Sequence, residues 1–182
     1  MVGDATHAEI EGGADWGVRD GVIAERPRGI PDHPLLDAIY DRHDELIAEH
    51  VDGDVLELAF GTRPYTGASV GVDAWRENCE LVRGIDPVLG DARSLPFADD
   101  SFDGVVGRRF IHHVEADRRP DIFEEVHRVV RPGGTLVVIE GTPGLYRRAV
   151  KGVGRTVGAL GEDNDLYGHL DVDEVHRLFE DA

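Results

Sequence analysis

The chain contains very little lysine and very little sulfur. Its 182 residues include one lysine, Lys151, and one cysteine, Cys79. A single cysteine cannot form an internal disulfide, which is typical of proteins from reducing compartments. Residues 1–9 carry neither a basic start nor an apolar stretch, so we expect no signal peptide. These absences argue against a disulfide-stapled secreted fold and favour a cytoplasmic protein.

Long apolar runs are also missing, and acidic residues far outnumber basic ones. No run approaches the roughly 20 apolar residues that cross a bilayer, so we expect no membrane span. The chain has 37 Asp and Glu against 19 Lys and Arg, a net charge of −18. Because the acids are spread along the whole chain, they favour a halophilic cytoplasm over a surface for a cationic ligand. Such a surface also argues against nucleic acid as a partner.

The apolar pattern of the remaining chain predicts one α/β domain over residues 1–182. Residues 1–30 are rich in Gly and acids, and we expect a loosely ordered N-terminal arm. Pro132-Gly133-Gly134 is expected to end a helix. Strands alternating with helices predict a doubly wound, mostly parallel sheet with helices on both faces. Strand patterns cover residues 55–60, 70–73, 86–91, 104–107 and 135–140, and helical patterns cover residues 35–50, 76–82, 117–131 and a last segment from 171.

The residues that follow these strands suggest a nucleoside site. Ligands on such sheets bind beyond the carboxyl ends of the strands, near the point where the strand order reverses. Ala59 and Gly61 are small enough to let the backbone approach a ligand. Asp73 ends the second strand, where a carboxylate can hold both hydroxyls of a ribose. Asp91 and the amide of Ala92 follow the third strand and can together hydrogen-bond the edge of an adenine.

Residues 90–106, GDARSLPFADDSFDGVV, resemble the central block of class I S-adenosylmethionine-dependent methyltransferases of the UbiE-like group. Residues 111–114, IHHV, and 128–136, RVVRPGGTL, resemble that group too, and the similarity extends from about Asp52 to the C-terminus. The resemblance implies a Rossmann-like transferase that uses S-adenosyl-L-methionine and a small-molecule acceptor, often a quinone or another lipophilic ring. It also implies cofactor-binding residues around the methionine part (Glu57, Ala59, Gly61), the ribose (Asp73) and the adenine (Asp91, Ala92).

The loop after the first strand departs from the family pattern. The family usually has glycine at three alternating positions, whereas this chain has Ala59, Gly61 and Arg63 there. Arg63 is followed by Pro64, which restricts the backbone of the residue before it. The short spacing from Gly61 to the second strand predicts that the first helix is reduced or replaced by a loop. If the second strand were misplaced, Asp86 would be the alternative ribose acid.

The C-terminal part also departs from the family. Two more strands normally follow the last helix, and we expect both to be missing here. The exposed edge of the fifth strand would then form a homodimer or be covered by residues 141–170. These departures leave open a non-catalytic binding or assembly module on the same fold. A nicotinamide-dependent oxidoreductase is disfavoured, since no Gly-x-Gly-x-x-Gly turn follows the first strand.

Two residue types near the end of the fourth strand are further candidates. Arg108 could meet a carboxylate and is taken as a cofactor-binding candidate, with a solvated surface charge as the alternative. His112 is the candidate catalytic base, since an acceptor could lie there. The alternative is that His112 and His113 cap the strand and line a loop. They have no Cys or carboxylate at ligand spacing, so no metal is expected.

Overall fold

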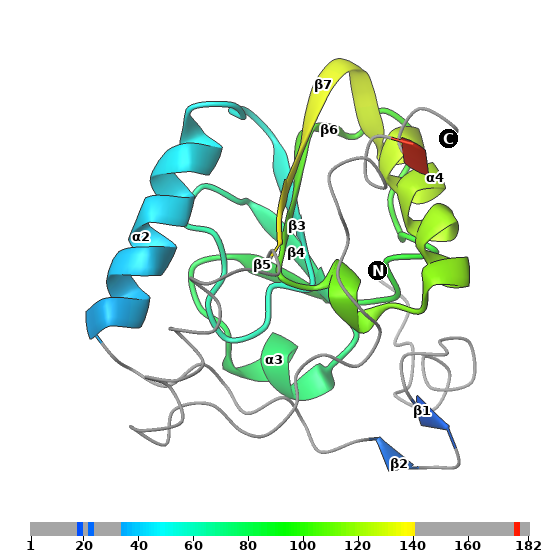
Figure 1. Ribbon diagram of the computed structural model, residues 1–182. Helices are drawn as coiled ribbons and strands as arrows, with labels where there is room; N and C mark the ends of the chain where they lie inside the picture. Colours follow the sequence, from blue (N-terminus) through cyan, green and yellow to red (C-terminus); the bar gives the residue numbers. More distant parts are fainter. Residues whose placement is uncertain (1–17, 20–21, 24–33, 141–176, 179–182) are drawn as a thin grey trace.

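The structure is a computed structural model that describes residues 18–19, 22–23, 34–140 and 177–178. Its centre is a five-stranded parallel sheet with the strand order β5-β4-β3-β6-β7. This confirms the predicted Rossmann-like parallel α/β fold (Figure 1). The strands are β3 (Val55–Leu58), β4 (Val70–Asp73), β5 (Asp86–Leu89), β6 (Phe102–Arg108) and β7 (Val130–Ile139), and the helices are α2 (Pro34–Ala48), α3 (Arg76–Leu81) and α4 (Arg119–Val129).

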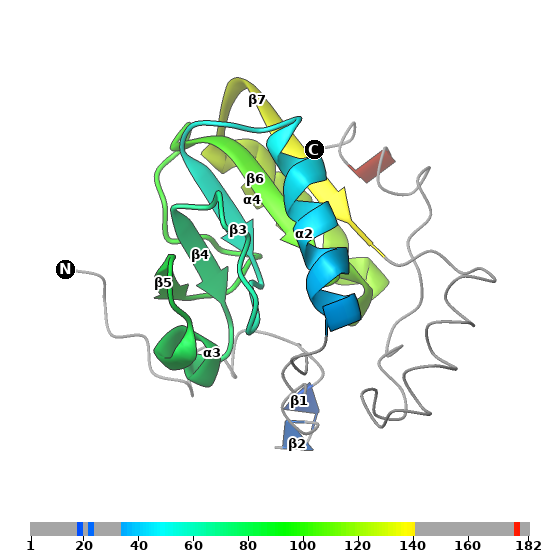
Figure 2. The ribbon, with the colours of Figure 1, turned by 90° about the vertical axis from the view of Figure 1, so that its left-hand side faces the viewer.

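The strand order places a topological switch in the middle of the sheet. From β3 the chain moves outward through β4 to β5, and then returns to add β6 and β7 on the other side of β3. Figure 2 shows the five strands side by side, with α2 in front of the part of the sheet formed by β6 and β7. Because all five strands are parallel, their carboxyl ends share one edge, with the switch between β3 and β6.

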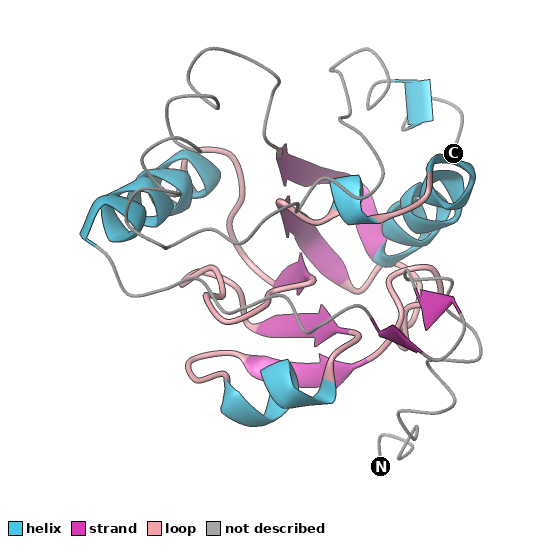
Figure 3. Ribbon diagram, turned by 60° about the horizontal axis from the view of Figure 1, so that its bottom comes forward, coloured by secondary structure: helices cyan, strands magenta, loops and turns pink. Residues whose placement is uncertain are grey.

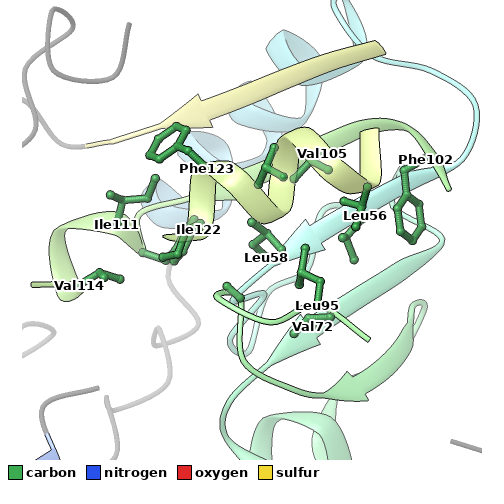
Figure 4. Close-up of a cluster of buried hydrophobic side chains, with 14 residues drawn as sticks. Leu56, Leu58, Val72, Leu95, Phe102, Val105, Ile111, Val114, Ile122 and Phe123 are labelled. Atoms are coloured by element: carbon green, nitrogen blue, oxygen red, sulfur yellow. The ribbon is translucent and has the colours of Figure 1, made fainter. Parts of the chain in front are cut away.

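Helix α4 covers one face of the sheet through a cluster of buried apolar side chains. Its residues Ile122, Phe123 and Val126 recur at helical spacing and are 1% exposed. Figure 4 shows Ile122 and Phe123 packed toward Leu58 and Val105 of the central strands. Burying a large apolar side chain contributes roughly 1.5–3 kcal/mol, so this stripe is the main reason why the segment folds as a helix against the sheet.

Helix α2 covers the opposite face, so that helices flank the strands on both sides (Figure 3). The second apolar cluster joins Ile47 and Val51, at and after the end of α2, to Val55 and Val106 in the sheet. Gly104 in β6 allows this approach, since a Cβ atom there would collide with the side chain of Val51. The helix end therefore sits directly on the central strands.

The connection from β3 to β4 is a loop over residues 59–69, as the short spacing predicts. In place of a helix, the loop itself contributes the buried side chains of Phe60, Tyr65 and Ala68 to the second apolar cluster. Gly71 in β4 leaves room for the ring of Phe60, which would otherwise meet a Cβ atom. The loop thus covers the sheet without a helical turn.

The prediction for residues 117–131 was partly wrong. Helix α4 ends at Val129, and Pro132-Gly133-Gly134 lie within the bounds of β7 instead of closing the helix. Proline disfavours the helical conformation of the residue before it, so the helix stops earlier. The β6–β7 register shifts between Phe102 and Gly104, which absorbs the extra residues.

Two predicted regions are covered only in part. A two-stranded antiparallel ladder, β1 (Val18–Arg19) with β2 (Val22–Ile23), lies within the predicted N-terminal arm. Residues 141–176 and 179–182 lie outside the described residues, and with them most of the last predicted helix and the question of missing C-terminal strands. The homodimer through the edge of β7 stays a prediction. None of the described helices is long and apolar enough to span a membrane.

Candidate functional site

Asp73 ends β4 at the carboxyl edge of the sheet and is only 3% exposed. Its Oδ1 accepts a hydrogen bond from the backbone N–H of Trp75 at 2.8 Å. Its Oδ2 accepts from the N–H of Gly61 at 2.9 Å and from the side-chain amide of Asn78 at 3.1 Å. Burial raises the pKa of Asp73 above its usual value, while these three donors oppose the shift. The carboxylate therefore ties the loop after β3 to the end of β4.

The loop after β3 turns sharply beside this carboxylate. Ala59 has φ +51° and Gly61 has φ +60°, both in the left-handed region. A Cβ atom at Gly61 would meet nothing within 4 Å, so the space beside this backbone is open. A ligand could therefore approach the main chain at Gly61, next to the Asp73 carboxylate.

Asp91 follows β5 at the same edge of the sheet. Its carboxylate accepts hydrogen bonds from the backbone N–H of Arg93 at 2.9 Å and from the Arg93 guanidinium at 2.9–3.2 Å. The neighbouring Ala92 is 3% exposed, and within residues 34–140 its N–H makes no hydrogen bond. A buried free amide needs a partner, and an adenine nitrogen would provide one. Asp86, in contrast, begins β5 and lies at the opposite end of that strand, so the topology excludes it from this site.

Glu57 and Arg108 form a buried ion pair across β3 and β6. The Arg108 Nε donates to Glu57 Oε1 at 2.8 Å, and the two side chains are 3% and 1% exposed. The second Glu57 oxygen accepts from the N–H of Tyr65 at 2.5 Å. Burial raises the pKa of Glu57 to about 7, although Arg108 and the Tyr65 amide pull it down. The Glu57 carboxylate is thus held by the protein's own donors.

The same arginine joins helix α2 to the loop after β3. Arg108 donates to Asp44 of α2 at 2.8 Å and to the carbonyl oxygen of Arg63 at 2.6 Å. The side chain of Arg63 pairs with Asp37 and lies over the ring of Tyr40, both in α2. Arg63 therefore fixes the loop to the helix, which gives a structural reason for an arginine where the family usually has glycine.

His112 lies just after β6, opposite the end of β7. Its Nδ1 is 2.6 Å from Oε2 of Glu140, the residue that follows β7, and both side chains are 10% exposed. The other oxygen, Oε1, accepts from the backbone N–H of Ile111 at 2.8 Å. The rings of His112 and His113 lie with their centroids 4.1 Å apart. The histidine therefore has a carboxylate partner 28 residues away.

A parallel sheet with a topological switch, an acid ending β4 and an open turn after β3 are together typical of Rossmann-like proteins that bind a nucleoside, a class that includes methyltransferases. Residues 52–138 match the family model described as a methyltransferase domain. The demethylmenaquinone methyltransferase of Mycobacterium sp. (strain KMS) is 35% identical over 137 residues, a match that spans 64% of this chain and 57% of that relative.

Solved structures agree on the fold. A SAM-dependent methyltransferase of Thermotoga maritima, described as a possible histamine N-methyltransferase, aligns with a TM-score of 0.62 at 22% identity, covering 78% of this chain and 69% of that one. A protein of Pyrococcus horikoshii aligns with a TM-score of 0.61 at 20% identity over 82% of both chains. The resemblance drawn from residues 90–106 is therefore confirmed for the fold, and the same residues lie within the region that matches the methyltransferase domain model.

Sequence reasoning found the residues at the strand ends but missed their partners. Glu140 was not proposed, although it follows the strand that neighbours the one before His112. Asp44, which pairs with Arg108 from 64 residues away, was also missed. Two signals could have pointed to these partners. Glu57 lies inside a strand of four buried residues, and a buried carboxylate requires a partner. The ends of β6 and β7 are adjacent, which brings Glu140 close to His112.

Proposed function

We propose that this protein transfers the methyl group of S-adenosyl-L-methionine to a small-molecule acceptor, and that the acceptor is a quinol ring. The observation that carries the proposal is the Asp73 carboxylate beside the open turn at Gly61, at the carboxyl edge of the sheet. Such a place suits a nucleoside, since a carboxylate accepts from ribose hydroxyls while a small-residue turn admits the ligand to the backbone.

The described residues fit the cofactor in three parts. Asp73 Oδ1 receives one hydrogen bond in the described chain, which leaves it able to accept from a ribose hydroxyl. The Ala92 amide would donate to the adenine, and Asp91 would accept from its amino group. Ala59 and Gly61 would line the methionine part. When bound, S-adenosyl-L-methionine supplies an activated sulfonium methyl group, and the protein's task is to hold the acceptor in line with it.

Glu57 and Arg108 have a supporting role in this proposal. Glu57 and Arg108 hydrogen-bond to each other, and they also bond to Asp44 and to the backbone of the loop. They therefore set the position of the turn that receives the methionine part, and neither carries a free charge for the cofactor. Removing either would change cofactor affinity through the shape of residues 59–65.

The quinol acceptor is proposed from the relatives that match residues in this domain, several of which are named demethylmenaquinone methyltransferases. A ring acceptor also suits the chemistry, since an ionised quinol is nucleophilic at the neighbouring ring carbon. The alternative is a module that keeps the fold without turnover. Arg63 is the residue that raised this alternative, and its bonds to α2 leave the turn at Gly61 open.

Two measurements test the proposal, both in molar KCl because of the net charge of −18. Calorimetric titration should show binding of S-adenosylhomocysteine and no binding of NAD. Labelled S-adenosyl-L-methionine should then transfer its methyl group to 1,4-naphthoquinol kept reduced with dithionite. Binding without transfer to the quinol would contradict the acceptor class, and absence of binding would contradict the methyltransferase function itself.

A further inference from the structure

The pair formed by His112 and Glu140 has the geometry of an oriented base. An ionised carboxylate only accepts hydrogen bonds, so the 2.6 Å contact requires that Nδ1 of His112 carries the proton. The neutral ring then has an unprotonated Nε2. Within residues 34–140 the Nδ1 contact is the one hydrogen bond of this ring, so Nε2 has no partner in that part of the chain.

The carboxylate is itself held in place. Its Oε1 accepts from the N–H of Ile111 at 2.8 Å while Oε2 accepts from the His112 ring. Glu140 thus fixes both the backbone of the turn (Ile111–His113) and the tautomer of the ring. A side chain that served only to cap the turn would need the first of these bonds and not the second.

The position of the pair suits an acceptor. His112 follows β6 and Glu140 follows β7, so both lie at the carboxyl edge of the parallel sheet. The candidate cofactor residues Gly61 and Asp73 lie at the same edge, across the switch between β3 and β6. The side chains of the pair are 10% exposed, which shields them from bulk water without closing them off.

Resting on the function proposed above, we infer that Glu140 is a positioning residue that holds His112 with Nε2 ready to take the proton from a quinol hydroxyl. The quinol proton moves to Nε2, and the adjacent ring carbon forms a bond to the methyl carbon of the cofactor. The methyl–sulfur bond breaks, and its electron pair stays on sulfur as S-adenosylhomocysteine forms. The methylated carbon loses its proton while His112 returns one to the oxygen, so the net reaction releases one proton.

Two variants separate orientation from structure. In Glu140→Gln the amide oxygen can still accept from Ile111, but the amide N–H₂ faces Nδ1 and favours the wrong ring tautomer. His112→Asn removes the base while its amide can still donate to Glu140. A general base contributes about 10²–10⁴-fold, so both variants should lower kcat on 1,4-naphthoquinol by about 100-fold. The affinity for S-adenosylhomocysteine should stay within about twofold of the wild type, because the pair lies on the acceptor side.

The pH dependence distinguishes a base from a structural contact. Raising the pH ionises the naphthoquinol hydroxyl without protein help, so the loss in kcat should shrink from neutral pH to about pH 10. The groups that face His112 in the described chain are the Glu140 carboxylate and the His113 ring. Glu140→Asp retains a carboxylate and should recover part of the activity that Glu140→Gln loses. Exposed residues of α4 supply matched controls, His127→Asn and Glu124→Gln, which should keep wild-type kcat.

Each outcome decides between the proposals. Wild-type kcat in Glu140→Gln, or a loss that is equal at every pH, would overturn the positioning role. A wild type that binds S-adenosylhomocysteine but does not methylate naphthoquinol would overturn the role of the pair as a quinol base. A wild type that binds no S-adenosylhomocysteine would overturn the proposed function instead. Melting temperatures of all variants should match the wild type within a few degrees. If Glu140→Gln does not fold, the kcat values of His112→Asn and Glu140→Asp provide the test.

Discussion

Two arginines at opposite ends of the sheet bind similar partners in different surroundings. At the carboxyl end, Arg108 pairs with Glu57 and Asp44 and donates to a backbone carbonyl, and its side chain is 3% exposed. At the amino end, Arg131 pairs with Asp54 and Asp103 and donates to two backbone carbonyls, and its side chain is 38% exposed.

The pKa values of the carboxylates in the two clusters are shifted in opposite directions. Hydrogen bonding to Arg131 lowers the pKa of Asp103 below its usual value. Burial raises the pKa of Glu57 to about 7 even though Arg108 donates to it. An arginine partner therefore stabilises the ionised carboxylate at the exposed Asp103. At the buried Glu57, an arginine partner does not compensate for the loss of hydration. Buried charged side chains gather at the carboxyl end, where Glu57, Asp73 and Arg108 lie.

The largest expected difference between the two ends is the loss of unfolding free energy when each arginine is replaced. Arg108→Met leaves Glu57 buried without its cation, so unfolding free energy should fall by about 3–5 kcal/mol. Arg131→Met breaks exposed pairs, which should cost about 1 kcal/mol or less. Urea unfolding at constant molar KCl measures both. Equal losses would mean that the two clusters do not differ in the way their burial indicates.

The second expected difference between the two ends is the pH dependence of the unfolding free energy that Glu57 and Asp103 contribute. The pKa of Glu57 is raised in the folded state, so its stabilising contribution is present below the unfolded value near 4.5 and is lost as pH rises toward about 7. The advantage of the wild type over Glu57→Gln should therefore shrink between pH 4.5 and pH 7. Asp103→Asn is the matched variant at the amino end. Since the folded pKa of Asp103 is lowered, its contribution should instead be lost as pH falls.

A smaller effect is expected at Ala59 in the turn after β3. Its φ of +51° is strained for a residue with a Cβ atom and free for glycine. Ala59→Gly should therefore stabilise the fold, by roughly 0.5–1 kcal/mol after the entropy cost of glycine. Thermal or urea unfolding measures the change. A loss of stability would show that the turn depends on the alanine side chain.

The sequence predicted this fold well where the evidence is local. Alternating apolar segments located every strand of the sheet, and the short span after Gly61 predicted a loop between β3 and β4. The end of the helix before Pro132 was placed two residues too late. Pro132 disfavours a helical Arg131, which is a local signal, but the strand that begins at Val130 depends on pairing with Phe102 in β6. Such pairing is a tertiary contact that local patterns do not report.

The residues of the candidate site also differ in whether local sequence patterns could predict them. Asp73 and Asp91 were proposed because each acid ends or follows a strand, and the structure places both at the carboxyl edge of the sheet. The partner of His112 was missed because Glu140 reaches it only through the order of strands β6 and β7. Arg108 was taken for a cofactor contact, while its bonds to Glu57 and Asp44 bridge 51 and 64 residues. Long-range ion pairs of this kind require the topology.

The most direct test of the central claim is the affinity of S-adenosylhomocysteine for the wild type, Asp73→Ala and Asp86→Ala, measured by calorimetry in molar KCl. A hydrogen bond to a charged acceptor contributes about 1.5–3 kcal/mol, so losing the ribose contacts of Asp73 should weaken binding more than tenfold. Asp86 lies at the amino end of β5 and its removal should change the affinity by less than about twofold. Asp73→Asn, which retains an acceptor oxygen for the turn at Gly61, should bind between the two. Binding that survives Asp73→Ala and is lost with Asp86→Ala would contradict the placement of the nucleoside at the carboxyl edge of the sheet.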